Sequence, residues 1–373
     1  MKSYPLAKPT IGRNEERAVR RVLRSGVLSL GSELAEFERR FARFVGTRYA
    51  CAVSSGTAGL HLALRAAGIG AGDEVITTPF SFVASANAIL YVGATPVFVD
   101  IDPMTYNINP AKIEERITRK TKAILVVHIF GQTADMHSIM ALARKHRLKV
   151  IEDACESVGA TYRGDMAGTF GESAVFAFYP NKQLTTGEGG MIVTNRKAHD
   201  ELFRSLRNQG RGRDKRWLSH ERLGYNYRMD EMSAALGHAQ LARIASFLRA
   251  RRAIARAYTR FLSAEPLLCV PREARGCRSS WFLYVVLVSR RLRDRVIAAL
   301  EKRGIAAKPY FPSIHLQPHY RKQFGFRRGD FPVAEEVSDR ALALPFYVGL
   351  TARDVALICQ ELLRVLKTHE KHL

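Results

Sequence analysis

Cysteine is scarce in this sequence and follows no pattern that binds a metal or builds a disulfide framework. The number of cysteines is odd, and no two of them form a Cys-x-x-Cys pair. They are Cys51, Cys155, Cys269, Cys277 and Cys359. A disulfide-rich secreted module and a structural zinc site are therefore excluded. We expect no metal, a reducing cytoplasmic environment and thiols that act as small apolar side chains.

Long uninterrupted apolar runs are also missing. The longest stretch without an acidic or basic residue extends from Val75 to Val99, and proline, glycine and hydroxyl residues interrupt it. We expect two buried strands around a helix there and no membrane span. The N-terminal segment MKSYPLAKPTIGRNEERAVRR has no apolar core, so we expect neither a secretory signal nor contact with a membrane.

Acidic residues are too few to balance the basic ones. Lys and Arg total 58 against 35 Asp and Glu, which gives the 373-residue chain a formal net charge of +23. A basic field attracts polyanions, although a solvated basic surface explains the charge equally well. No base-reading motif accompanies the basic residues, so we expect no sequence-specific binding of nucleic acid. A local surplus between residues 201 and 260 contains the cluster Arg211, Arg213, Lys215 and Arg216.

The pattern that is present is an alternation of strands and helices. Hydrophobic residues make up 47% of the chain and charged residues 25%, as in a folded protein with a large and a smaller domain. Short apolar runs, typical of strands buried on both faces, lie at 50–53, 74–77, 96–99, 123–127, 149–152, 174–178 and 191–194. They predict an α/β fold with a mostly parallel seven-stranded sheet between helices. The short link between the last two leaves room for one antiparallel strand.

Helical patterns flank this block, and a compositional shift follows it. Enrichment in Pro, Gly and Arg near residues 265–277 indicates a linker region. We therefore predict a large domain over residues 1–250 and a smaller C-terminal α/β domain over residues 251–373. Beyond the central block we expect helices at Arg13–Ser25, Ser32–Phe44, Met229–Tyr258, Arg291–Lys302 and Ala352–His369, and a strand at Trp281–Val288.

Two strand ends carry residues suited to a ligand. The segment SSGTAG (54–59) has small residues that let a ligand approach the backbone at the start of a helix, where free N–H groups bind phosphate. The same residues cap ordinary helices, and alone they favour a cap. The segment VIEDACE (150–156) places Asp153 at the end of a buried strand, where a carboxylate can hold a protonated ring nitrogen, coordinate Mg²⁺ or cap the next helix.

Lys182 supplies the third element, in the segment FYPNKQLTTGEGG (178–190). A lysine between an apolar strand and a Gly-rich turn is poorly placed for a solvated role, and a buried amine becomes a nucleophile. An ordinary loop lysine beside a tight turn is the alternative. A phosphate cradle, an acidic strand end and this lysine, in that order, match the phosphate clamp, ring-nitrogen partner and Schiff-base amine that pyridoxal 5'-phosphate needs.

Longer stretches carry a family resemblance. They are SSGTAGLHLAL (54–64), TTPFSFVASANAI (77–89), VIEDACESVGA (150–160), FAFYPNKQLTTGEGGMIVTN (176–195), GYNYRMDEMSAALGHAQL (224–241), PYFPSIHLQP (309–318) and ALPFY (343–347). Through them the chain resembles the DegT/DnrJ/EryC1/StrS family of pyridoxal-phosphate-dependent nucleotide-sugar aminotransferases, which have the aspartate-aminotransferase-like fold, fold type I. The resemblance extends from Lys8 to about Leu350.

The resemblance implies roles for the residues around the cofactor. Lys182 would bond to pyridoxal 5'-phosphate and later move a proton between sugar and cofactor, and Asp153 would keep the ring nitrogen protonated. Phe82 would stack on the ring, and a core phenylalanine is the alternative. The cofactor phosphate would be bound by Gly56, Thr57 and Ala58.

Other matching residues would serve the substrate or the neighbouring subunit. Asn226 and Arg228 match residues that reach into the partner's site, where Asn226 touches the phosphate and Arg228 the anionic substrate. The resemblance therefore implies a homodimer with shared active sites. His315 aligns with a substrate-side histidine, and a purely structural role fits it equally well.

Two positions depart from the family pattern. Ala177 stands where many relatives have a serine that contacts the phosphate, which puts one clamp contact in doubt. Glu156 falls near the phenolic oxygen of the cofactor, where the family usually has glutamine. The presence of Lys182 argues against the dehydratase branch, which has histidine there.

Two functions from different classes follow. The first is an enzyme that moves an amino group from L-glutamate to a keto group, most simply at C4, of a nucleotide-diphosphate-linked deoxy sugar in polysaccharide or O-antigen biosynthesis. The alternative is a basic nucleic-acid-binding regulator that uses the same fold without catalysis. Lys182 and Asp153 favour the enzyme. An amino-acid lyase or decarboxylase of the same fold is disfavoured by the match along the whole chain.

Overall fold

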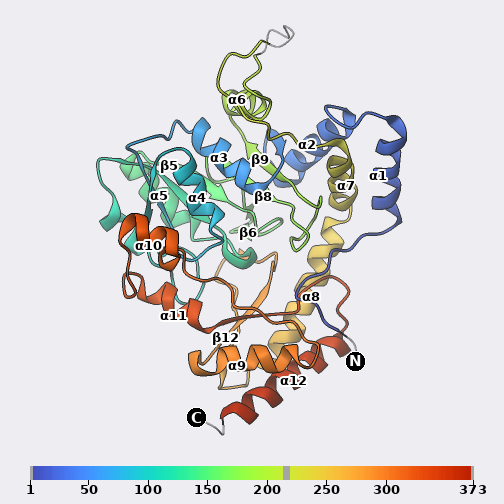
Figure 1. Ribbon diagram of the computed structural model, residues 1–373, viewed down its shortest axis with the longest axis vertical. Coiled ribbons are helices and arrows are strands. Elements are labelled where there is room, and N and C mark those ends of the chain that lie inside the picture. Colours follow the sequence, from blue (N-terminus) through green and yellow to red (C-terminus); the bar gives the residue numbers. More distant parts are fainter. Residues whose placement is uncertain (1–2, 213–218, 371–373) are drawn as a thin grey trace.

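The seven strands expected between residues 50 and 195 form one sheet in the computed structural model, which describes residues 3–212 and 219–370 (Figure 1). In chain order they are β1 (Tyr49–Val53), β2 (Glu74–Thr77), β3 (Thr95–Phe98), β4 (Thr121–Val127), β5 (Lys149–Asp153), β8 (Ser173–Ala177) and β9 (Gly190–Thr194). Their order across the sheet is β1-β9-β8-β5-β4-β2-β3. β9 is antiparallel to both of its neighbours, and the other pairings are parallel. The predicted α/β fold and mostly parallel sheet are confirmed.

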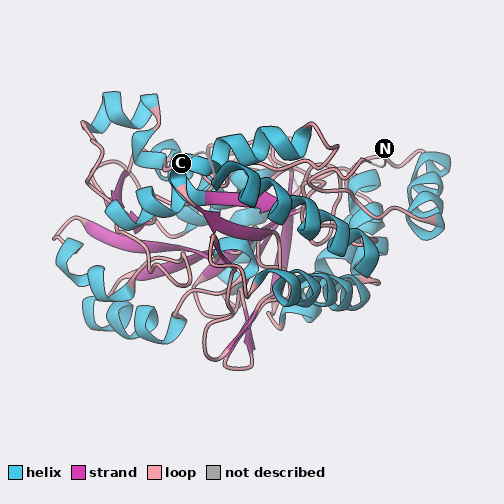
Figure 2. Ribbon diagram, turned by 90° about the horizontal axis from the view of Figure 1, so that it is seen from below, coloured by secondary structure: helices cyan, strands magenta, loops and turns pink. Residues whose placement is uncertain are grey.

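Helices cover both faces of this sheet because successive strand residues point to opposite sides (Figure 2). Val175 packs in a cluster with α3, whereas its neighbours Ala174 and Phe176 pack against α2 on the other face. The helices of this part are α1 (Arg13–Ser25), α2 (Ser32–Val45), α3 (Gly56–Ala66), α4 (Ala84–Tyr91), α5 (Met136–His146), α6 (Lys197–Arg207) and α7 (Glu231–Leu241). Short 3₁₀ turns occupy Pro110–Lys112, Glu114–Arg116 and Ile129–Gly131.

The C-terminal part is built on a second, antiparallel sheet. Its strands are β10 (Leu268–Cys269), β12 (Tyr284–Val288) and β13 (Ala341–Leu344). Its helices are α9 (Arg290–Glu301), α10 (Pro318–Phe324), α11 (Pro332–Arg340) and α12 (Ala352–Glu370), with a 3₁₀ turn at Ile314–Leu316. A third small sheet joins the two parts through β6 (Thr161–Tyr162), β7 (Asp165–Met166) and β11 (Cys277–Arg278).

The single helix expected over Met229–Tyr258 is two helices, α7 and α8 (Ile244–Leu262). Figure 1 shows α8 running from the large sheet to the C-terminal part. Its first turns pack in the core of the large domain through Phe247, and its later turns pack in the core of the C-terminal part through Tyr258. The proposed boundary at residue 250 therefore falls inside a continuous helix. Tyr4, assigned by sequence to the large domain, also packs in the C-terminal core.

The charge-free stretch from Val75 to Val99 contains β2, α4 and β3, as expected. Within the described residues, no helix combines the length and apolarity needed to cross a membrane. Of the basic cluster, Arg213, Lys215 and Arg216 lie outside the described residues.

Candidate active site

A cavity of about 460 Å³ opens at the carboxyl ends of the parallel strands β4, β5 and β8. The last residue of each strand lines it, as expected for a ligand site in an open α/β sheet. Phe282, Tyr310 and Phe311 of the C-terminal part close another side. The sequence-predicted residues that line the cavity are Gly56, Thr57, Phe82, Asp153, Glu156 and Lys182.

One wall of the cavity is the N-terminus of α3, for which the sequence left a phosphate cradle and a helix cap as alternatives. Ser55 is the N-cap, because its Oγ accepts a hydrogen bond from the Ala58 N–H at 3.1 Å. Gly56 and Thr57 line the cavity, whereas Ala58 does not. The N–H groups in the first turn of a helix lack intrahelical acceptors and attract anions. The segment therefore caps the helix through Ser55, which accepts from one N–H, and Gly56 and Thr57 still face the cavity.

Gly56 is required there by space. A Cβ at this position would lie 2.8 Å from Cβ of Ala177 and 2.9 Å from Sγ of Cys155. Ala177 thus forms the wall behind the helix start and brings no hydroxyl to it. Ser55 and Thr57 line the same cavity, and their hydroxyl groups can donate hydrogen bonds as the serine found in many relatives at position 177 would.

Asp153 faces the cavity from the end of β5 and is 4% exposed. Its Oδ2 accepts a hydrogen bond from Oγ of Ser85 at 2.6 Å, and its Oδ1 accepts one from the Cys155 N–H at 3.2 Å. Its main-chain oxygen accepts from the His128 N–H at 3.1 Å. Both the carboxylate and its backbone are therefore fixed by neighbours on three segments.

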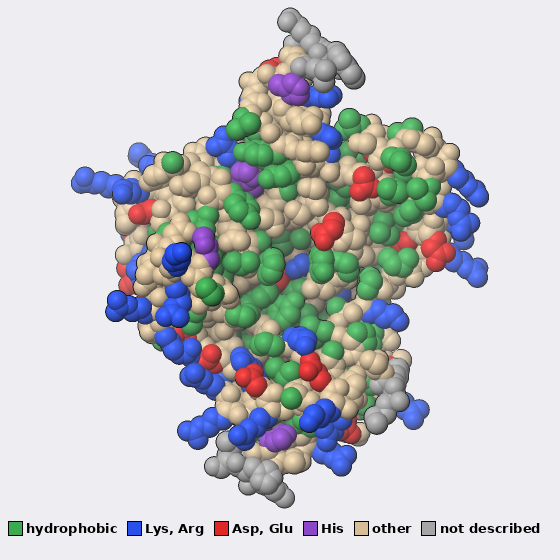
Figure 3. All heavy atoms as spheres, in the orientation of Figure 1, with side chains coloured by type: hydrophobic (Ala, Val, Ile, Leu, Met, Phe, Trp, Pro, Cys, Tyr) green, Lys and Arg blue, Asp and Glu red, His purple; other side chains and the backbone are tan. Residues whose placement is uncertain are grey.

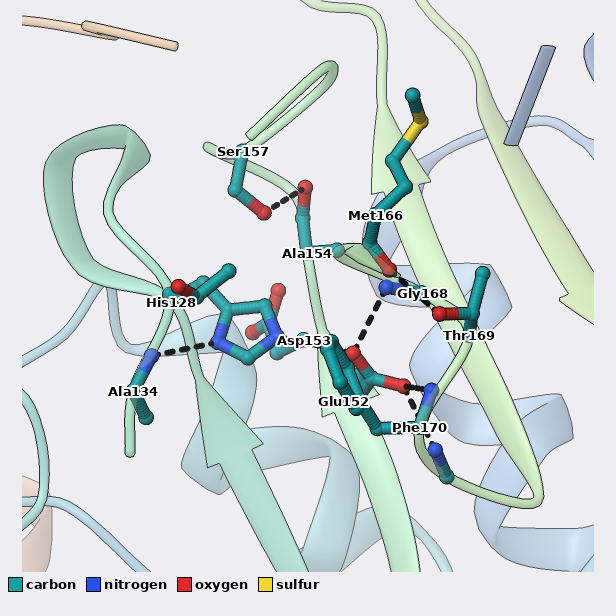
Figure 4. A network of polar contacts seen from close by, with 12 residues as sticks. His128, Ala134, Glu152, Asp153, Ala154, Ser157, Met166, Gly168, Thr169 and Phe170 are labelled. Carbon is teal, nitrogen blue, oxygen red and sulfur yellow. Dashed lines mark hydrogen bonds and ion pairs between the residues drawn. The ribbon is translucent and has the colours of Figure 1, made fainter. Parts of the chain in front are cut away.

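Glu152, the preceding residue, is fully buried and points away from Asp153 (Figure 4). Its Oε2 accepts hydrogen bonds from His128 Nε2 at 3.0 Å and from the Gly168 N–H at 2.7 Å. Its Oε1 accepts from the N–H groups of Phe170 and Gly171 at 2.8 and 2.7 Å. Nδ1 of His128 accepts a hydrogen bond from the Ala134 N–H at 3.2 Å, so the ring proton of His128 lies on Nε2. One carboxylate thus ties the end of β5 to two loops.

Lys182 lines the same cavity, with its side chain largely buried. Its Nζ is 3.4 Å from Oε1 of Glu156 and 3.9 Å from the centre of the Phe282 ring. Oε2 of Glu156 accepts a hydrogen bond from the Phe130 N–H at 3.0 Å. Burial raises the pKa of Glu156, and the Lys182 ammonium and the Phe130 N–H partly oppose this rise. A protonated carboxyl offers one donor and one acceptor, as the more usual glutamine does.

Arg251 of α8 fixes the backbone of the lysine loop, and no sequence motif marks this residue. Its Nη2 donates to the main-chain oxygen of Lys182 at 3.2 Å, and its Nη1 donates to those of Trp281 and Phe282, both at 3.2 Å. Burial lowers the pKa of this guanidinium to about 10. Arg251 therefore joins the loop that carries the lysine to the aromatic wall that contacts it.

Asn226 and Arg228 do not line the cavity of their own chain. Nη1 of Arg228 donates to Oδ1 of Asn208 at 2.9 Å, and Asn226 forms an isolated antiparallel bridge with Asn208. The structure brings these two residues together near the end of α6, apart from Lys182.

His315 is fully buried and does not reach the cavity either. Its Nε2 lies 3.0 Å from Oε1 of Glu335, its ring packs edge-on against Phe331, and burial lowers its pKa. This is the geometry of a structural histidine, which is one of the two alternatives that the sequence left open.

Comparison with known proteins agrees with this architecture. The model of the DegT/DnrJ/EryC1/StrS aminotransferase family matches residues 9–363. The spore coat polysaccharide biosynthesis protein SpsC of Bacillus subtilis is 41% identical over 365 residues, which cover 94% of each chain. GDP-perosamine synthase of Caulobacter vibrioides is 41% identical over 97% of this chain and 98% of its own. The Streptococcus pneumoniae protein Spr1654, solved in a PLP form, superposes with a TM-score of 0.94 at 28% identity, covering 98% of this chain and 99% of its own.

The Glu152 network predicts a large stability effect from a nearly isosteric change. Glu152→Gln presents an NH₂ group to two of the four donors, which leaves buried N–H groups unpaired. We expect the free energy of unfolding, measured in urea, to fall by about 2–4 kcal/mol. Glu156→Gln is the matched control, because it introduces the usual residue of the family in the cavity wall, and it should change stability little. Equal stability of both variants would contradict the role assigned to Glu152.

Proposed function

Because the chain belongs to the DegT/DnrJ/EryC1/StrS aminotransferase family, we propose that it transfers an amino group from L-glutamate to the C4 keto group of a nucleotide-diphosphate-linked deoxy sugar for polysaccharide or O-antigen biosynthesis. The observation that carries this proposal is the convergence of Lys182, Asp153 and the start of α3 on one cavity. A relative of similar length is named for polysaccharide biosynthesis and another for a GDP-linked sugar.

The cavity fits pyridoxal 5'-phosphate, the cofactor of this family. The start of α3, with its anion-binding N–H groups, and the Asp153 carboxylate both line it, which suits a ligand with a phosphate and a basic ring nitrogen. The side chain of Phe82 is 60% exposed and lines the cavity, so an aromatic face is available to a ring. Oδ1 of Asn181 is buried there without a partner, which leaves an acceptor for a bound group. When bound, the cofactor supplies the electron sink and carries the amino group between the two substrates.

The residues of the chain then have separate tasks. Lys182 would hold the cofactor covalently until the amino donor replaces it, and its released amine, which lies beside Glu156 and Phe282, would then move the proton. Asp153 would keep a proton on the ring nitrogen, because a hydrogen-bond acceptor beside that nitrogen favours its protonated form. Gly56 and Thr57 hold the phosphate. Glu156 lies where it can exchange a hydrogen bond with the phenolic oxygen.

A second copy of the chain is the partner that completes the site. Lys182 is the only basic side chain among the described residues that line the cavity, so a diphosphate needs cations from elsewhere. Arg228 and Asn226 contact Asn208 and do not line the cavity of their own chain, and we assign them to the site of a neighbouring copy. Leu23, Val27 and Leu30 are each more than half exposed, and such apolar surface suits association of two copies.

The regulator alternative has less support. On the face drawn in Figure 3, the Lys and Arg side chains of the described residues lie along the left and right edges and over the lower part. A spread of this kind fits a solvated basic surface better than a nucleic-acid site. The charge also suits an enzyme whose substrates are anionic.

Incubation with a panel of nucleotide keto-sugars tests the reaction. We expect ¹⁵N from labelled L-glutamate to appear in a nucleotide amino sugar, detected by mass spectrometry, when the panel includes 3-keto and 4-keto sugars on GDP, UDP and dTDP. The position of the label decides between C3 and C4. Lys182→Ala is the control without transfer. If none of the sugars receives the ¹⁵N label although the cofactor is bound, the proposed substrate class is refuted.

Borohydride reduction tests the cofactor and its attachment. We expect the visible absorbance of the purified holoprotein to disappear on reduction, and a peptide map to place the pyridoxyl group on Lys182. Lys149→Ala, which removes a lysine of β5 that bonds to a main-chain oxygen outside the cavity, should retain the adduct. An adduct on any other lysine would overturn the assignment.

Mixed dimers test the shared site. Lys182→Ala and Arg228→Ala proteins, each inactive alone, are unfolded together and refolded in equal amounts. Half of the dimers are then mixed and each holds one intact site, so about a quarter of wild-type activity should return. Lys182→Ala mixed with Asp153→Ala is the control, because both residues line the same cavity and no intact site can form. No recovery in the first mixture, with mixed dimers verified by native mass spectrometry, would rule out sharing through Arg228.

A further inference from the structure

Two buried serines form a chain of hydroxyl groups that ends on the Asp153 carboxylate. Oγ of Ser85 lies 2.6 Å from Oδ2 of Asp153, and Oγ of Ser81 lies 2.8 Å from Oγ of Ser85. The two serines are 5% and 1% exposed in chain order, and both line the cavity. Ser81 precedes α4 and Ser85 lies in its first turn, and Phe82 lies between them in the sequence.

The chemistry of the end group sets the direction of this chain. An ionised carboxylate only accepts hydrogen bonds, so Ser85 donates its single hydroxyl proton to Asp153. Ser85 can then only accept from Ser81, which donates to it. The distance of 2.6 Å is in the range of charge-assisted O–H···O⁻ hydrogen bonds, which are stronger than those between neutral groups.

The two oxygens of Asp153 are therefore held by different parts of the fold. Oδ1 accepts from the Cys155 N–H, just after β5, and Oδ2 accepts from Ser85 of α4. Two anchors on separate oxygens fix the plane of the carboxylate, whereas one anchor leaves it free to rotate about its χ angles.

We propose that Ser85, supported by Ser81, is a positioning residue that holds the Asp153 carboxylate in the orientation that faces the ring nitrogen of the cofactor. The proposal rests on the proposed function. It also links two contacts with the ring, because the backbone that carries the hydroxyl chain carries Phe82. The residues that anchor Asp153 and the aromatic side chain of Phe82 thus share one backbone segment.

Binding of two ligands to the apoprotein tests this role without measuring turnover. The ligands are pyridoxal 5'-phosphate and its 1-deaza analogue, which has carbon in place of the ring nitrogen and cannot use Asp153 in the same way. We expect Ser85→Ala to weaken binding of pyridoxal 5'-phosphate about tenfold to a hundredfold and to leave binding of the deaza analogue within about twofold of wild type. Ser81→Ala should show the same selectivity with a smaller loss.

Two further variants separate positioning from simple structural damage. Ser85→Thr keeps the hydroxyl, so its binding of pyridoxal 5'-phosphate should be close to that of the wild type. Thr77→Val removes a buried hydroxyl of β2 that bonds to the Leu125 oxygen at 2.9 Å and not to Asp153, so it should not change the preference between the ligands. If Ser85→Ala unfolds, as judged by thermal denaturation of the apoprotein, Ser81→Ala and Ser85→Thr still provide the comparison.

The outcomes also separate this role from the proposed function. Equal weakening of both ligands by Ser85→Ala, or no weakening of either, overturns the positioning role while the enzyme assignment stands. A wild-type protein that binds neither ligand overturns both.

Discussion

The end of β5 carries two carboxylates on opposite faces of the sheet, and the site depends on the one that never meets the ligand. Glu152 accepts four hydrogen bonds in a fully buried position, three of them from backbone N–H groups and one from His128. A buried carboxylate is tolerable only when it is saturated in this way. The loops that it gathers fix the strand end, and Asp153 projects from that end into the cavity. The precision required of Asp153 is therefore provided by its neighbour in the sequence.

Local signals in the sequence predict much of the fold. The predicted bounds of the helix Arg13–Ser25 agree with α1, because Gly12 and Gly26 flank an amphipathic pattern. The turn between α7 and α8 was missed because the stretch is rich in Ala and Leu and has no Gly or Pro at Ala242 and Arg243. Parallel strands bring their carboxyl ends to one edge, so Asp153, at a strand end, could be assigned to a ligand site from the sequence.

The contacts that hold the site could not be predicted in the same way. Ser85 and Asp153 are 68 residues apart in the chain, and Arg251 and Lys182 are 69 apart. No local pattern in composition or periodicity marks such pairs. Asn226, Arg228 and His315 received roles only from the family resemblance. For His315 the structure shows instead a buried pair with Glu335, which a sequence motif does not reveal.

Arg251 has a consequence for protein engineering. Its guanidinium donates to main-chain oxygens of Lys182 on one segment and of Trp281 and Phe282 on another, so the two segments share this one donor. A transplant of the 281–282 wall from a relative, intended to alter substrate range, would keep this junction only if the graft preserves the backbone path as well as the arginine. Library design should therefore treat the lysine loop, the wall and position 251 as one module and vary them jointly.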